Sequence, residues 1–148
     1  MRRVTLVTAV AFGAFVFLGI SFLLARALTG QGAERSRVVE VLRAQARGDA
    51  GAVLRELPAC AREPACERVT RARVANLERP GKVEVLTFRP SVNLTLTRRS
   101  GTGRVAWRAG GSLPVVQCFK AQREGPLTGG GAKLLAMSDP IGLEASCG

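Results

Sequence analysis

Histidine and tyrosine are absent from the 148 residues, and aspartate occurs only at positions 49 and 139. Without histidine, no Ser-His-Asp or Cys-His arrangement and no imidazole ligand for a metal ion can form. Asp49 is expected to cap a helix and Asp139 to lie in a turn before Pro140. We therefore expect a protein that is not an enzyme and that has no cofactor and no metal site.

Charged residues are missing from a long N-terminal run. Residues 4–25 are uncharged and mostly apolar, and as a helix they would be about 33 Å long, enough to cross a hydrocarbon core of ~30 Å. This length favours an uncleaved transmembrane anchor over residues 1–26. The motif Ala25-Arg26-Ala27 also fits the small-x-small cleavage site of a signal sequence, so a cleaved leader is the alternative. The first reading predicts a single-pass protein of the cytoplasmic membrane whose C-terminal domain lies outside, in contact with the lipid bilayer. The second predicts a secreted protein.

The cysteines all follow the uncharged run, at Cys60, Cys66, Cys118 and Cys147. An even number of cysteines in a short exported domain favours disulfides, and four cysteines allow three pairings. We favour Cys60–Cys66, which closes a turn around Pro64, and Cys118–Cys147, which ties the chain end to a strand. A zinc site is a less favoured alternative, because the spacing lacks the C-x2-C pairs of structural zinc sites. Reduced, buried thiols in a cytosolic domain are a third reading.

The spacing of apolar residues predicts a change from helices to strands along the chain. Residues 27–35 contain Gly30 and Gly32 and are expected to form a flexible tether. Residues 36–148 are then one extracytoplasmic domain. Its first part has helical periodicity, and its second part alternates as half-buried strands do. This order indicates an α+β fold with helices packed on a curved antiparallel sheet. The expected helices begin near Ser36, Asp49 and Pro64, and the expected strands lie at 83–88, 92–97, around 105–107, at 113–123 and at 134–137.

The helix pair around Gly48-Asp49-Ala50, within residues 38–54, resembles the nuclear transport factor 2-like superfamily. The segments 103–107 and 114–118 support this resemblance, which covers roughly residues 36–141. It implies a cone-like fold, and it extends to single-span, membrane-anchored extracytoplasmic proteins of actinobacteria. Members of the superfamily bind small apolar molecules inside the cone, which implies a pocket lined here by Trp107, Gln117 and Phe119. Catalytic members work with Asp, His or Tyr in this pocket, and the absence of His and Tyr here argues against catalysis.

Arginine supplies 19 of the 22 basic residues, and the formal net charge is +11. Such arginine-rich composition is typical of GC-rich bacterial coding sequences, so part of this charge reflects codon usage. Arg68, Arg71, Arg98 and Arg99 are candidates for contacts with anionic headgroups near a membrane surface. No aromatic residues alternate with them, and we expect no binding to nucleic acid. The sequence thus predicts a binding or assembly role at the cell envelope, with an envelope protein or anionic lipid as partner. The alternative function is a ligand-binding or enzymatic cone with an internal pocket.

Overall fold

The computed structural model describes residues 2–91, 100–123 and 131–147, and within the first helix it leaves out the side chains of residues 2–6, 9 and 26–31. The helices precede the strands, as the sequence predicts. The helices are α1 (Arg2–Ala46), α2 (Ala50–Glu56), α3 (Pro58–Ala61) and α4 (Pro64–Leu77), and the strands are β1 (Val83–Arg89), β2 (Ser100–Ala109), β3 (Val115–Arg123) and β4 (Ala132–Met137).

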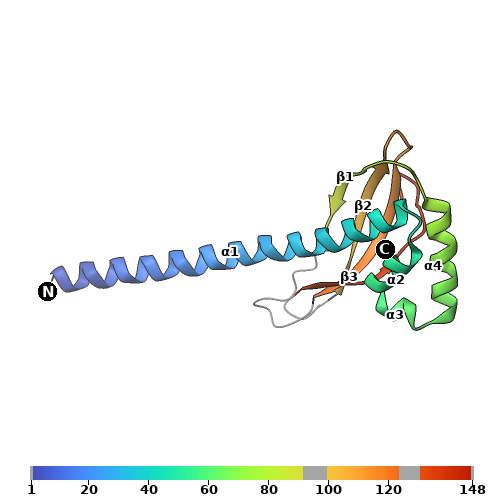
Figure 1. Cartoon of the computed structure of the whole chain (residues 1–148). Coiled ribbons are helices and arrows are strands. Elements are labelled where there is room, and N and C mark those ends of the chain that lie inside the picture. The colour runs from blue at the N-terminus through green and yellow to red at the C-terminus, as the bar shows by residue number, and fades with distance from the viewer. Residues whose placement is uncertain (1, 92–99, 124–130, 148) are drawn as a thin grey trace.

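The four strands form one antiparallel sheet in the order β1-β2-β3-β4. The C-terminal part of α1 lies across one face of this sheet, and α2, α3 and α4 lie near the C-terminal end of α1 (Figure 1). The N-terminal part of α1 projects away from the domain. The expected α+β class with helices on an antiparallel sheet is therefore confirmed. The strand expected at residues 92–97 lies outside the described residues.

Alternating side chains of the central strands face the helices and form the core. In β2, Val105, Trp107 and Ala109 are buried, and they meet Val38 and Leu42 of α1 in one apolar cluster. Full burial of one such aliphatic side chain contributes about 1.5–3 kcal/mol. The core therefore fixes the C-terminal part of α1 to the sheet.

The edge strand β1 departs from the alternation that its sequence predicts. Its pairing with β2 shifts between Val85 and Thr87, which leaves Leu86 as an extra residue. This β-bulge reverses the side-chain direction after it, so that Phe88 rather than Thr87 turns inward and packs against the core. The Phe88 ring stacks on Phe119 with centroids 5.5 Å apart.

The end of α1 is defined by local backbone chemistry. Gly48 adopts φ +71°, its N–H donates to Gln45, and the Asp49 N–H donates to Ala44. This is the Schellman pattern, which favours glycine because other residues are strained at positive φ. The Asp49 carboxylate then accepts a hydrogen bond of 2.8 Å from the Ala52 N–H and caps α2. The predicted role of Asp49 is confirmed.

Both favoured disulfides are present, between Cys60 and Cys66 and between Cys118 and Cys147. The first joins α3 to α4. The second ties the C-terminal tail to β3, and the Ile141 N–H donates to the Val116 carbonyl along the same path. The tail therefore first pairs along the edge of β3 and then reaches the face of the sheet opposite the helices at the Cys118–Cys147 bond.

The prediction of a transmembrane helix over residues 1–26 is wrong for the part of the chain that the structure describes, where no helix combines the length and the apolar character needed to cross a membrane. The described side chains between residues 7 and 25 belong to the N-terminal part of α1. They are exposed, with Phe12 71% and Phe15 77% accessible.

Residues 27–35, expected to be a tether, continue α1 without a break. Each glycine inside a helix costs about 1 kcal/mol relative to alanine, which lowers helix stability without forbidding it. Within this segment, the buried Glu34 carboxylate accepts a hydrogen bond of 2.7 Å from the Ser91 N–H. This contact fixes α1 to the segment that follows β1.

Candidate functional site

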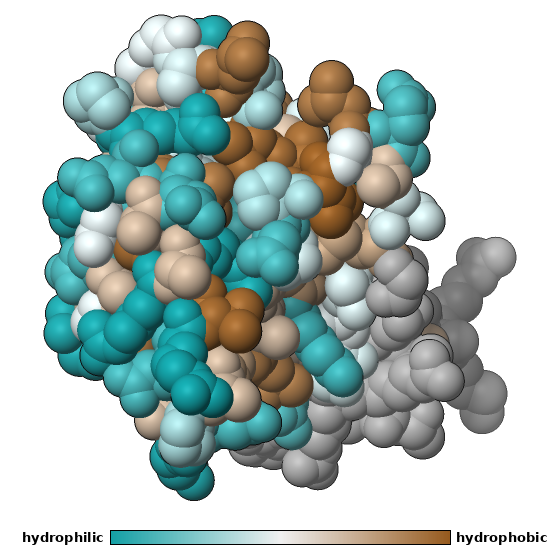
Figure 2. Space-filling model, turned by 90° about the vertical axis from the view of Figure 1, so that its right-hand side faces the viewer, coloured by the Kyte–Doolittle hydropathy of each residue, from teal (hydrophilic) through white to brown (hydrophobic). Residues whose placement is uncertain are grey.

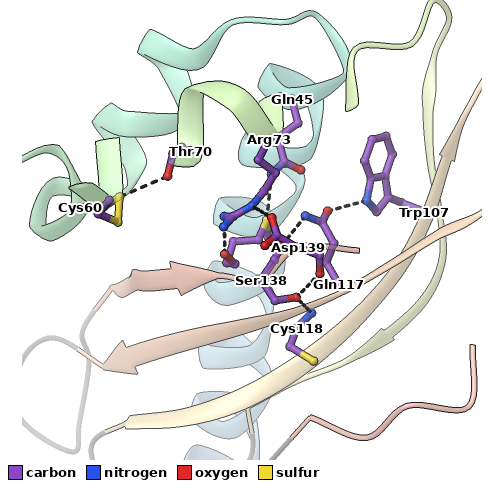
Figure 3. A network of polar contacts seen from close by, with 11 residues as sticks. Gln45, Cys60, Thr70, Arg73, Trp107, Gln117, Cys118, Ser138 and Asp139 are labelled. Carbon is purple, nitrogen blue, oxygen red and sulfur yellow. Dashed lines mark hydrogen bonds and ion pairs between the residues drawn. A yellow bond between two sulfur atoms is a disulfide. The ribbon is translucent and has the colours of Figure 1, made fainter. Parts of the chain in front are cut away.

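The interior between the helices and the sheet holds the three residues predicted to line a pocket. Trp107, Gln117 and Phe119 are 0%, 0% and 1% exposed, and they come from the neighbouring strands β2 and β3. Trp107 Nε1 donates to Gln117 Oε1 over 2.9 Å (Figure 3). Gln117 Nε2 donates to the Ser138 carbonyl over 2.9 Å. The structure therefore brings the three residues together, but as packed core with their polar atoms paired to one another and to the backbone.

A second polar cluster joins α4 to the end of β4. Arg73 Nε lies 2.5 Å from Asp139 Oδ1, and Arg73 Nη1 donates to the Met137 carbonyl. The neighbouring Ser138 Oγ accepts from the Cys118 N–H over 2.9 Å and donates to the Asp139 carbonyl (Figure 3). Asp139 does not lie in the predicted turn but in a segment that runs along β3, between backbone hydrogen bonds from Ser138 and Ile141 to that strand, and its carboxylate binds a guanidinium across the fold. This arrangement is a structural clamp.

Unlike Trp107 and Gln117, the buried Gln45 of α1 does not have all its polar atoms paired. It is 0% exposed, and its Nε2 lies 3.4 Å from the Met137 sulfur, a weak acceptor. Its Oε1 has no hydrogen-bond partner in the described part of the chain. A buried amide oxygen without a partner costs about 1–3 kcal/mol, so Gln45 is the least satisfied polar residue of this interior.

The interior offers few groups for chemistry. Across the described ranges, no three Cys, Asp or Glu side chains gather as they would around a metal ion. The paired amide of Gln117 and the indole of Trp107 are poor acids and bases near neutral pH. The arrangement can hold the helices in a fixed position against the sheet.

The basic residues predicted to contact anionic surfaces are only partly described. Arg68 and Arg71 lie exposed on α4, and Arg71 pairs with Glu67 at 2.7 Å, whereas residues 98 and 99 lie outside the described residues. Figure 2 views the molecule from the α4 side, where hydrophilic residues cover much of the surface and apolar residues lie between them. An exposed i,i+4 ion pair of this kind contributes little to stability.

Sequence reasoning missed a different group of cations. A surface groove where α1 ends against the link between α4 and β1 is lined by Arg43, Arg47, Arg79 and Lys82, together with Glu78. We call this feature the basic groove. A usable signal was present: two arginines spaced i,i+4 precede Gly48, and two more cations flank Pro80-Gly81. Each pair taken alone, however, has an ordinary interpretation, as solvated charges beside the glycine or proline that ends a helix.

In comparisons with family models, with curated proteins and with solved structures, nothing matches this chain. The resemblance to the nuclear transport factor 2-like superfamily accordingly stays a prediction from the sequence.

Proposed function

We propose that this chain is a non-catalytic binding or assembly domain that acts outside the cytoplasm, at the cell envelope. The observation that carries the proposal is the closed interior. Trp107, Gln117 and Phe119 occupy the space in which a cone-like domain would hold a ligand, and their polar atoms are used within the fold. A domain with such an interior works through its surface.

The two disulfides support the location. Disulfides persist in oxidising compartments and are rare in the cytosol, so the Cys60–Cys66 and Cys118–Cys147 bonds favour an exported domain. The apolar residues between 7 and 25 project from this domain and are not part of its core. In the proposal they belong to an export signal that is cleaved at Ala25-Arg26-Ala27, and the domain contacts an envelope protein or anionic lipid.

Site-specific photocrosslinking in cells that produce the protein tests this function. A photoreactive phenylalanine is placed singly at exposed positions on different elements, such as Arg68 on α4, Lys82 before β1 and Leu143 in the tail. The proposal predicts a discrete adduct with an envelope protein or lipid from a subset of these positions. The absence of adducts at all exposed positions would contradict the proposal.

Native mass spectrometry supplies the complementary measurement. A surface-binding domain is expected at the mass of its own chain. A stoichiometric small molecule that stays bound and alters the fluorescence of the single tryptophan, Trp107, would instead point to an internal site and overturn the proposal.

A further inference from the structure

Within the described part of the chain, no carboxylate lies within ion-pair distance of the four cations of the basic groove. Among the described residues, ion pairs within 4.0 Å involve Arg37, Arg71, Arg73 and Arg108. None of the groove's cations takes part in such a pair. The one acidic residue of the groove is Glu78, whose carboxylate lies over Gly48, 2.8 Å from the position that a Cβ would take there. Four positive charges against one negative charge leave the groove with a net charge of about +3 at neutral pH.

Arg79 supplies an independent observation. Its Nε is buried and has no hydrogen-bond partner among the described residues, a condition that it shares with the Nε of Arg104 outside the groove. A buried donor on a charged group without an acceptor is costly, and structures rarely leave one without a reason. This Nε is closed to solvent, so it can bond to a ligand only if the Arg79 side chain turns toward the groove that it lines, and the positive charge there favours a negatively charged acceptor.

Helix capping does not account for these cations. Arg43 and Arg47 are close to the C-terminus of α1, where positive charge is generally favourable. The last carbonyls of α1 are, however, already bonded to backbone donors, including the Ala46 carbonyl, which accepts from the Arg79 N–H over 2.9 Å. Arg79 and Lys82 follow α4 rather than α1, and they still line the same groove.

The backbone of the groove is held rigidly. The Lys82 carbonyl accepts from the Gly110 N–H over 3.2 Å. Gly81 adopts φ +112°, and a Cβ at this position would lie 2.8 Å from Gly110. The link between α4 and β1 is thus packed backbone to backbone on the turn between β2 and β3. A site built on such a link is preorganised for its ligand, which reduces the entropy lost on binding.

We propose that the basic groove binds a phosphate group, carried either by a phospholipid headgroup or by a soluble phosphate compound. Guanidinium groups bind phosphate oxygens through two parallel hydrogen bonds, and three arginines provide several such donors around one groove. The volume of about 620 Å³ accommodates a phosphate together with part of the molecule that carries it. This inference deepens the proposed surface-binding function and rests on it.

Titration of the full chain in non-ionic detergent tests the groove. The probes are inorganic phosphate, glycerol phosphate, dihexanoyl-phosphatidylglycerol below its micelle concentration, and dihexanoyl-phosphatidylcholine as the zwitterionic lipid. Binding is measured by calorimetry and by the shift of the arginine Nε–H resonances in NMR spectra. We expect the Arg79 resonance to move on addition of phosphate. If glycerol phosphate binds at least as tightly as the anionic lipid, the ligand is soluble; the reverse order identifies a headgroup.

Matched variants separate a defined site from general attraction by a basic protein. Arg79→Gln and the exposed Lys82→Gln should each weaken phosphate binding, Arg79→Gln by about tenfold or more because a charge-assisted hydrogen bond is lost. Arg68→Gln removes the same charge from α4 and should change the affinity by less than about twofold, since exposed charges are largely screened. Equal effects of Arg68→Gln and Lys82→Gln, or no binding of any phosphate probe, would overturn the proposal. If photocrosslinks still form elsewhere on the surface in that case, only the proposal for the groove is wrong, and the surface-binding function stands.

Discussion

Two buried glutamines on opposite layers of the fold provide a matched pair of substitutions. Gln117 has both ends of its amide paired, to Trp107 Nε1 and to the Ser138 carbonyl, whereas Gln45 has an orphan Oε1 and a weak contact with the Met137 sulfur. Both side chains are 0% exposed. Changing each to leucine keeps the size of the side chain nearly constant and removes its polar atoms. The two variants therefore differ mainly in the buried groups that lose a hydrogen-bond partner.

Gln117→Leu leaves the buried Trp107 N–H and the Ser138 carbonyl without a partner. Each orphaned buried group costs about 1–3 kcal/mol, and for the two together we expect this variant to lower the free energy of unfolding by about 2–6 kcal/mol. Gln45→Leu removes an oxygen that is already orphaned and leaves only a sulfur, which tolerates an apolar neighbour. For this variant we expect no loss, or a gain of about 1 kcal/mol.

Urea denaturation followed by the fluorescence of the single tryptophan measures both variants. Trp107 reports directly on the interior, and the midpoint at constant slope gives the change in the free energy of unfolding. A control for the slope is circular dichroism, which should give the same midpoints. A loss from Gln45→Leu as large as that from Gln117→Leu would refute the description of the two amides.

The remaining predictions concern the two disulfides and the Asp49 cap of α2. With sequence separations of 29 and 6 residues, the chain-entropy relation predicts that replacing Cys118 and Cys147 by serine lowers the free energy of unfolding by about 3.6 kcal/mol, against about 2.2 kcal/mol for Cys60 and Cys66. Denaturation of the two double variants checks the order, and the reverse order would contradict it. Asp49→Ala should cost about 1 kcal/mol through loss of the α2 cap, whereas Asp49→Asn should cost less; equal losses would show that charge rather than the cap bond matters.

Features set by local chemistry could be predicted from the sequence. Gly48 followed by Asp49 fixes the end of one helix and the start of the next, because both roles depend on residues within one turn of chain. The alternation in β2 likewise identified Val105 and Trp107 as one face, and their burial confirms it. The disulfide pairing was accessible because short-range closure favours Cys60–Cys66 and leaves the other two cysteines for each other.

Features set by distant partners could not be predicted in the same way. Whether β1 carries an extra residue at Leu86 is decided by its pairing with β2, and nothing in the alternation of β1 itself announces the bulge. Residues 27–35 are helical and make a long-range contact, from the Ser91 N–H to Glu34, that the spacing of their glycines does not reveal. The basic groove combines residues from two segments more than thirty positions apart, so each pair of cations by itself has the appearance of a solvated surface.

The redox state of the cysteines in cells that produce the protein shows whether this domain resides in an oxidising compartment. Free thiols are trapped by alkylation at the moment of lysis, and the peptides are then analysed by mass spectrometry with and without reductant. We expect that none of the four cysteines is alkylated before reduction and that the linked peptides join Cys60 to Cys66 and Cys118 to Cys147. Four alkylated cysteines in unreduced samples would contradict a domain that works in an oxidising compartment outside the cytoplasm.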